Sequence, residues 1–282
     1  MIYLLLDTSY IIFYRYYALL QWWKIAKSDE ELGNPNENPE FVEKFEKTFL
    51  ECINNIKKKL KIHKEKVCVI AARDCPRTEI WRNEFFNSYK EHRVQDDTFM
   101  GGPFFKKVYY EGLLEKAGAD YILKYNNLEA DDVIAITKNY IECNKILKCN
   151  DINKKDSIYI ITNDQDYLQL INENTHIYNL KFKQLNSTKK SFKDPQKDLL
   201  CKIILGDKSD NIPPVFSKCG PKTVEKYLDN HDLLESDLDK YNVKDKFIFN
   251  RKMIDFNEIP NDLMTGFTND YKQTLNEIIN LQ

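Results

Sequence analysis

Residues 1–9 read MIYLLLDTS, in which a short apolar run leads directly into an aspartate. Similar runs precede acidic residues in VCVIAARD (67–74), DYIL (120–123) and IYIITNDQD (158–166). Runs of four or five apolar residues without polar alternation predict strands that are buried on both faces. We therefore expect strands at Ile2–Leu6, Val67–Ala71, Asp120–Leu123 and Ile158–Ile161, and a fifth at His176–Leu180.

Longer segments that suit helices separate these strands. In Phe41–Lys61, apolar residues recur at helical spacing, which predicts one amphipathic helix. The polar stretch Ser28–Glu40 reads as a loop. Buried strands that alternate with helices predict an α/β fold with a mainly parallel sheet. After Asp194 no strand pattern remains, so we expect an α/β body over 1–193 and a helical region over 194–282.

The composition and the lack of long apolar runs favour a soluble, intracellular protein. The chain has 282 residues, with 42 basic and 44 acidic side chains and a net charge of −2. The seven cysteines form no C-x-x-C pair, which predicts free thiols in a reducing compartment. No signal peptide or membrane-spanning run is visible. We expect a soluble, intracellular protein without a membrane partner, and the pattern leaves cytoplasm, nucleus and viral replication site open.

Carboxylates follow all four of the strands predicted first. Because the carboxyl ends of parallel strands share one edge, these side chains should converge there. Such a cluster repels itself unless cations neutralise it, and carboxylates alone suit Mg²⁺ or Mn²⁺. Any single aspartate after a strand is more often a helix N-cap, but all four strand ends together favour a metal site. The seven residues are Asp7, Asp74, Glu129, Asp131, Asp132, Asp164 and Asp166.

A further acidic pair lies in the helical region, in LGDKSDNIP (205–213). Asp207 and Asp210 are three residues apart, which places both on one face of a helical turn. The same residues are also common in turns and caps. Alone, this pair is weak evidence for a metal site.

Together these segments resemble the 5′-nuclease superfamily: flap endonucleases, phage 5′-exonucleases and the 5′–3′ exonuclease domain of bacterial DNA polymerase I. The resemblance rests on LLLDTSYIIFYRYYA, IWRNEFFNSYKEHR, LEADDVIA, ITNDQDYLQL, LGDKSDNIP and the Gly220–Thr223 segment GPKT, in that order. It implies a PIN-like sheet flanked by helices, a helical arch at about 78–115, and a C-terminal helix–hairpin–helix subdomain that binds DNA.

The resemblance also implies a metal-dependent, structure-specific 5′ nuclease that acts in replication or repair. Two Mg²⁺ ions, which Mn²⁺ can replace, would be held by Asp74, Glu129 and Asp131, with Asp7 behind them, and by Asp164, Asp166 and Asp210. Asp132 and Asp207 would contribute through water. Lys90 and Arg93, on one helix face, would contact the scissile phosphate, with Arg82 two turns earlier on a neighbouring phosphate. The implied DNA-binding residues are Arg15, Tyr89, Gly220, Lys222 and Thr223.

The hairpin Pro213–Gly220 departs from the family pattern. It is one residue longer and has two glycines fewer, and Pro214 replaces a backbone amide that would approach phosphate. A K⁺ ion at this hairpin is therefore doubtful, and the contact with duplex DNA is expected to be weaker or reshaped.

Three alternative functions share parts of this pattern. The first is ribonuclease H-like removal of RNA from RNA–DNA hybrids by the same fold, which the sequence leaves open. The second is a non-catalytic protein that binds DNA junctions, against which the complete acidic set argues. The third, a phosphatase or dinucleotide-binding protein, lacks its motifs. We expect a monomer that acts on flaps, 5′ ends or nicked duplexes.

Overall fold

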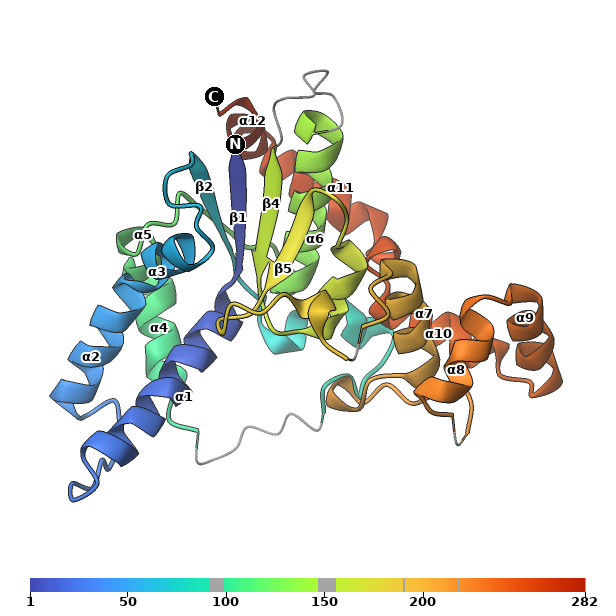
Figure 1. Ribbon diagram of the computed structural model, residues 1–282, viewed down its shortest axis with the longest axis horizontal. Helices are drawn as coiled ribbons and strands as arrows, with labels where there is room; N and C mark the ends of the chain where they lie inside the picture. The colour runs from blue at the N-terminus through green and yellow to red at the C-terminus, as the bar shows by residue number, and fades with distance from the viewer. Residues whose placement is uncertain (92–98, 147–155, 190, 218, 282) are drawn as a thin grey trace.

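The computed structural model describes residues 1–91, 99–146, 156–189, 191–217 and 219–281. Its centre is a parallel sheet in the order β3-β2-β1-β4-β5 (Figure 1). All five expected strands are present, so the predicted α/β class is confirmed. Their bounds are β1 Ile2–Asp7, β2 Val67–Ala72, β3 Tyr121–Leu123, β4 Ser157–Ile161 and β5 Thr175–Tyr178.

Helices cover both faces of the sheet (Figure 1). Leu4 and Leu6 of β1 pack with the helices of one face, and Tyr3 and Leu5 pack with those of the other, as the period of two in a strand requires. The first layer contains α1 Thr8–Ala26, α2 Pro39–Leu50, α3 Cys52–Lys59, α4 Gly102–Tyr110 and α5 Leu113–Lys116. The second contains α6 Ala130–Ile141, α11 Asn261–Asp270 and α12 Lys272–Asn280.

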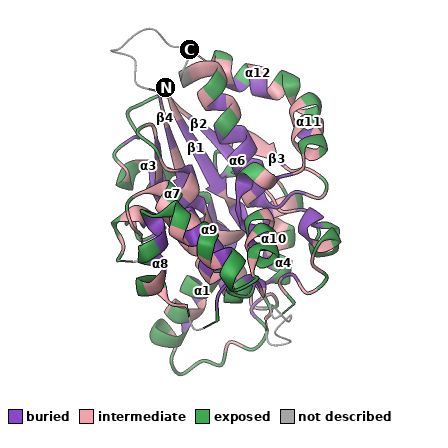
Figure 2. Ribbon diagram, turned by 90° about the vertical axis from the view of Figure 1, so that its right-hand side faces the viewer, coloured by how far each residue is buried: buried purple, intermediate pink, exposed green. Residues whose placement is uncertain are grey.

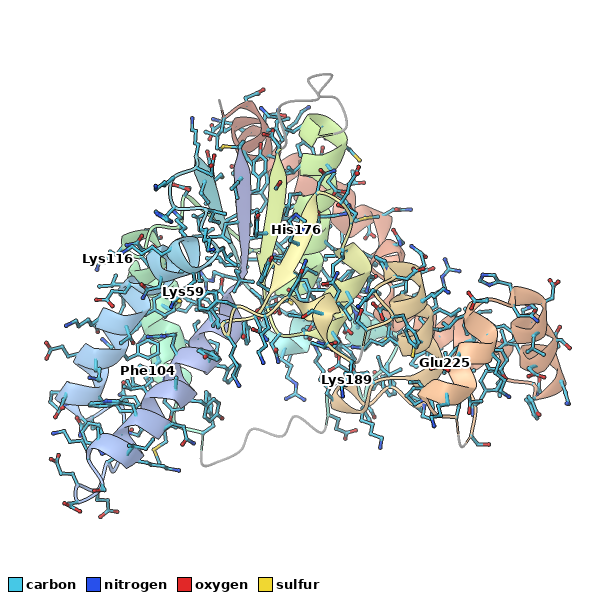
Figure 3. The ribbon with its side chains drawn as sticks, viewed as in Figure 1. Lys59, Phe104, Lys116, His176, Lys189 and Glu225 are labelled. Carbon is cyan, nitrogen blue, oxygen red and sulfur yellow. The ribbon has the colours of Figure 1, made fainter. Side chains whose placement is uncertain are left out.

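Aromatic residues fill the core of the first layer. The Phe104 ring of α4 lies 4.6 Å from the Phe45 ring and 5.6 Å from the Phe41 ring, between centroids (Figure 3). The single helix predicted over Phe41–Lys61 is in fact two, α2 and α3, which meet at Glu51. Glu51 keeps helical dihedral angles, so the predicted apolar stripe continues across the junction and is buried.

The chain beyond Asp194 is helical in its described part, as expected, and it has a small core of its own. Phe216, Val224, Tyr227 and Leu238 are among the residues buried there. Figure 2 shows further buried positions along the sheet and α6. The helices of this region are α7 Pro195–Leu205, α8 Pro221–Leu228, α9 His231–Lys240 and α10 Lys244–Ile254. The last two helices return to the body, where Phe267, Leu275 and Ile278 join the core beside α6.

Short helical turns connect these elements and carry several site residues. They are η1 Arg77–Glu79, η2 Trp81–Glu84, η3 Glu142–Ile146, η4 Gln165–Leu170, η5 Leu185–Ser187, η6 Lys208–Asp210 and η7 Phe256–Glu258. The predicted arch at 78–115 includes 92–98, which lie outside the described residues. Its second half contains α4, which packs into the body through Phe104 and Val108.

Two sequence-based expectations concern the chain as a whole. Six cysteines are free, and Cys149 falls in a stretch that the structure does not describe. Across the described ranges, no helix is both long enough and apolar enough to cross a membrane.

Candidate active site

A cleft of about 320 Å³ opens at the carboxyl edge of the sheet. The strands end there and deliver acidic side chains to it, as the sequence predicts. Five of the nine predicted carboxylates line the cleft: Asp7, Asp74, Glu129, Asp131 and Asp164. The predicted convergence on one edge is therefore present in the structure.

Asp7 ends β1 and caps α1. Its carboxylate accepts a hydrogen bond from the Tyr10 amide at 3.1 Å and another from the Thr162 hydroxyl at 2.8 Å. Burial raises the pKa of Asp7 from 3.8 to about 7, with a further contribution from the charge of Asp74. Asp74 accepts hydrogen bonds from the Ser9 hydroxyl and from the Ala130 amide. Without a cation, burial and the charge of Asp74 therefore oppose ionisation of Asp7.

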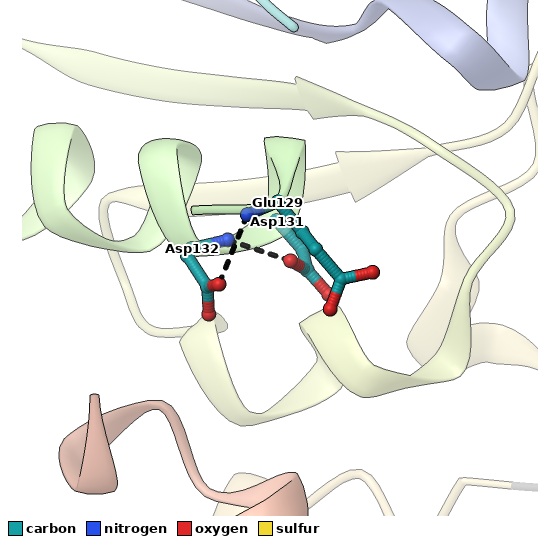
Figure 4. Close-up of side chains that lie close together, drawn as sticks. All are labelled: Glu129, Asp131 and Asp132. Carbon is teal, nitrogen blue, oxygen red and sulfur yellow. Dashed lines mark hydrogen bonds between the residues drawn. The ribbon is translucent and has the colours of Figure 1, made fainter. Parts of the chain in front are cut away.

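The first turn of α6 carries Glu129, Asp131 and Asp132 (Figure 4). Glu129 and Asp132 form a capping box, in which the Glu129 amide donates to the Asp132 carboxylate at 3.1 Å. Burial, and then the charges of Asp132 and Glu129, raise the pKa of Asp131 well above its usual range. One oxygen from each of the three carboxylates lies within 4.8 Å of the others, a spacing that a metal ion could bridge.

Arg82 is buried in the protein, whereas the sequence analysis expected it to contact a phosphate. Its guanidinium donates to both oxygens of Asp132 at 2.9 Å, to Glu129 at 3.0 Å and to the Met253 carbonyl at 2.9 Å. Only 2% of the residue is exposed, and it does not line the cleft. The expectation that Arg82 faces a phosphate is therefore wrong, because its guanidinium already donates four hydrogen bonds to protein acceptors. Trp81 also donates to Asp132, so the Asp132 carboxylate holds Arg82 and the start of α6.

The helix expected to join Arg82 to Lys90 is also absent. Only the four residues of η2 are helical there, and the residues that follow up to Glu91 are turns or irregular chain. Lys90 has a left-handed φ of 56°, which a continuous α-helix does not allow. Arg93, predicted to share its helix face, lies outside the described residues.

Lys90 and Tyr89 nevertheless reach the acidic centre. The Lys90 ammonium contacts Glu129 and lies 3.8 Å from Asp210. The Tyr89 hydroxyl is buried and donates to Glu129 at 3.0 Å and to Asp210 at 3.3 Å. Burial opposes ionisation of Glu129, but Lys90 and Arg82 outweigh it and lower the Glu129 pKa to about 2.

A second acidic group adjoins the cleft. Asp166 of η4 comes together with Asp207 and Asp210 around η6, with one oxygen from each within 4.8 Å of the others. The Lys202 ammonium of α7 bridges Asp166 and Asp207, at 2.8 Å from the latter. Burial opposes ionisation of Asp207, but Lys202 and then Ser209 outweigh it and lower its pKa to about 2. Asp207 and Asp210, which were weak evidence for a metal site in the sequence alone, thus lie next to Asp166, a carboxylate that follows β4.

The other predicted DNA-binding residues lie away from the cleft lining. Arg15 is half-buried on α1, two residues after Phe13, which lines the cleft. Gly220 precedes α8, and Lys222 and Thr223 lie in its first turn, with Lys222 exposed. Their role in binding DNA stays a prediction.

The sequence analysis did not single out Ser9, Thr162 and Lys202, which hold carboxylates at this edge, nor Tyr167, which lines the cleft. Ser9 and Thr162 are hydroxyl residues that follow β1 and β4, so their place after a strand was a usable signal. Lys202 lies within a helix, and nothing in its local sequence shows that it meets Asp166.

The donor set fits hard divalent cations. Carboxylates make up both groups, and among the residues that the structure describes no histidine lines the cleft. The Lys90 ammonium lies between Glu129 and Asp210, and the Lys202 ammonium lies between Asp166 and Asp207. Each ammonium group thus provides positive charge between carboxylates that would otherwise repel one another. Oxygen-only ligation of this kind suits Mg²⁺ or Mn²⁺ better than zinc.

Comparisons with known proteins agree with this geometry. DNA polymerase I of Lactococcus lactis subsp. cremoris is 30% identical over 178 residues, covering 60% of this chain and 18% of the polymerase. A 5′–3′ exonuclease of Buchnera aphidicola is 31% identical over 182 residues, covering 62% of this chain and 56% of that protein. The matched region is thus little more than half of the second relative and much less of the first.

Solved structures show the same fold over nearly the full chain. A bacteriophage T5 flap endonuclease, solved with DNA and metal ions, superposes with a TM-score of 0.63 at 14% identity, covering 98% of this chain and all of that one. The T5 5′-exonuclease with bound zinc gives 0.64, with the same identity and coverage. The family model for the N-terminal, resolvase-like domain of 5′–3′ exonucleases matches residues 2–197. The chain therefore belongs to the 5′–3′ exonuclease family.

Proposed function

We propose that this protein is a metal-dependent, structure-specific 5′ nuclease that hydrolyses phosphodiesters in 5′-ended or branched DNA. The observation that carries the proposal is that two groups of carboxylates, each close enough to share a cation, lie side by side. Glu129 and Asp131 line the cleft together with Lys90, and the Lys90 ammonium is 3.8 Å from Asp210 of the adjoining group. Family membership and the shared fold support the same activity.

Two Mg²⁺ ions, when bound, would supply an activated water and neutralise charge on the scissile phosphate. Asp74, Glu129 and Asp131, with Asp7, would hold one ion. Asp164, Asp166 and Asp210 would hold the other, with Asp207 through water. Asp132 is committed to Arg82 and Trp81, so we assign it to orienting Glu129 rather than to a cation.

Lys90 would contact the phosphate of the substrate. Its ammonium group lines the cleft and pairs with Glu129 and Asp210. Once cations neutralise those carboxylates, the ammonium is available to a phosphate oxygen and stabilises charge that develops there. Ser9 and Thr162 keep Asp74 and Asp7 oriented toward the cleft by donating hydrogen bonds to them.

Duplex DNA would lie against the C-terminal helices. Lys222 is exposed at the start of α8, where a helix N-terminus and a positive charge both favour phosphate. Recognition of this kind reads shape rather than base sequence. We expect the protein to act as a monomer on flaps, 5′ ends or nicks.

A cleavage assay tests the proposal. A flap duplex labelled at its 5′ end is incubated with Mg²⁺ and, separately, with EDTA. Parallel reactions contain an RNA flap and a blunt duplex. We expect cleavage near the junction in Mg²⁺ alone; preference for the RNA flap would favour the ribonuclease H-like alternative. Tight binding without cleavage in Mg²⁺ or Mn²⁺ would instead indicate a non-catalytic junction-binding protein.

A further inference from the structure

The hydroxyl of Tyr167 is an unpaired donor beside the acidic cleft. Tyr167 belongs to η4, lines the cleft and is only 1% exposed. Its ring packs edge-on against Phe256, with 6.0 Å between centroids. Within the described part of the chain, that hydroxyl has no hydrogen-bond partner.

The other hydroxyls that line this cleft all have protein partners. Ser9 donates to Asp74, Thr162 donates to Asp7, and the Tyr10 hydroxyl accepts from the Leu180 amide. A buried hydroxyl without a partner costs free energy, and phenylalanine would fill the same space without that cost. The Tyr167 hydroxyl therefore indicates that a bound ligand accepts its hydrogen bond.

The charges around Tyr167 indicate what that ligand is. Asp7, Asp131 and Asp164 line the same cleft as Tyr167. A phenol hydroxyl can donate one hydrogen bond. A donor among carboxylates that bind cations is suited to an oxygen atom that the same cations hold.

We propose that Tyr167 donates a hydrogen bond to an oxygen bound to a divalent cation in this cleft. That oxygen belongs either to a water of the cation's hydration shell or to the phosphate of a bound DNA strand. Mg²⁺ keeps several waters in protein sites, so the first source requires no substrate. The inference rests on the proposed function, because it assumes that the carboxylates bind cations.

The test compares Tyr167→Phe with a matched control, Tyr3→Phe. Tyr3 is also fully buried, and its hydroxyl has no hydrogen-bond partner among the residues that the structure describes. It lies near the start of β1 and does not line the cleft. Both variants lose one hydroxyl and keep their ring. Both should therefore melt in EDTA at or above the wild-type temperature, which shows that they fold.

Calorimetric titration with Mn²⁺ then measures cation affinity without DNA and with a bound flap duplex that carries a non-hydrolysable linkage at the junction. We expect Tyr167→Phe to weaken cation binding about 10-fold, as losses around metal ligands commonly do, and Tyr3→Phe to leave it unchanged. A loss without DNA assigns the oxygen to water, and a loss only with DNA assigns it to phosphate. Wild-type affinity in both arms would overturn the inference.

Failure of the proposed function has a different signature. If the wild-type protein itself binds no Mn²⁺, both the proposed function and the role of Tyr167 are wrong. If wild type and Tyr167→Phe bind Mn²⁺ equally and wild type cleaves DNA, only the role of Tyr167 is wrong.

Discussion

In the absence of divalent cations, Asp7→Asn should stabilise the protein at neutral pH. Burial, and then Asp74, raise the Asp7 pKa from 3.8 to about 7. The folded state therefore keeps this proton over a pH range in which the unfolded chain has released it. The free energy of unfolding consequently falls as pH rises through that range, and the stabilising contribution is complete only at acidic pH.

The size of the effect follows from the shift. Three pK units correspond to about 4 kcal/mol, at about 1.4 kcal/mol per unit. Because water reaches the cleft, we expect about 2–3 kcal/mol of this between about pH 5 and pH 8. The amide that Asp7→Asn introduces cannot ionise, so the variant should lack that part of the pH dependence while its side-chain oxygen still accepts the Tyr10 amide.

Urea unfolding in EDTA at the two pH values measures the difference. Wild type should lose about 2–3 kcal/mol more than Asp7→Asn on going from pH 5 to pH 8. Added Mg²⁺ should restore wild-type stability at pH 8, because a cation favours the ionised carboxylates. Equal losses for both proteins in EDTA would refute the account of the Asp7 environment.

Three other predictions follow from the same structure. Asp74→Asn should abolish cleavage and leave flap binding in Ca²⁺ intact, as gel-shift and cleavage assays would show; unchanged turnover would contradict the metal site. Lys90→Ala should lower turnover about 100- to 1,000-fold, whereas Lys59→Ala, at an exposed lysine on α3, should not; a change in affinity alone would make Lys90 a binding residue. Gly206→Ala should cost about 1–3 kcal/mol in urea unfolding, because φ is +68° and its Cβ would lie 2.4 Å from a carbonyl oxygen. Gly102→Ala has open space and should cost much less.

The sheet and the acidic edge could be predicted because both depend on local sequence. Each strand is a short apolar run, and carboxylates such as Asp7 and Asp74 follow directly, so the parallel topology alone brings them together. The pair Asp207 and Asp210 was weak by itself. It gained meaning only through contact with Asp166, which is distant in the chain.

The role of Arg82 could not be predicted in the same way. Its spacing from Lys90 favoured a shared helix face, but its partners lie in α6 and at Met253, 171 residues away. Burial of a guanidinium requires full pairing, and only the tertiary fold supplies it. The bridging Lys202 was missed for the same reason, since its acidic partner belongs to another part of the chain.

The most direct test of the central claim is an anomalous difference map from crystals soaked in Mn²⁺. We expect two peaks, one beside Asp74, Glu129 and Asp131 and the other beside Asp164, Asp166 and Asp210, roughly 4 Å apart as two-metal hydrolysis requires. Absence of peaks at these carboxylates, in crystals that bind Mn²⁺ elsewhere or not at all, would contradict the account.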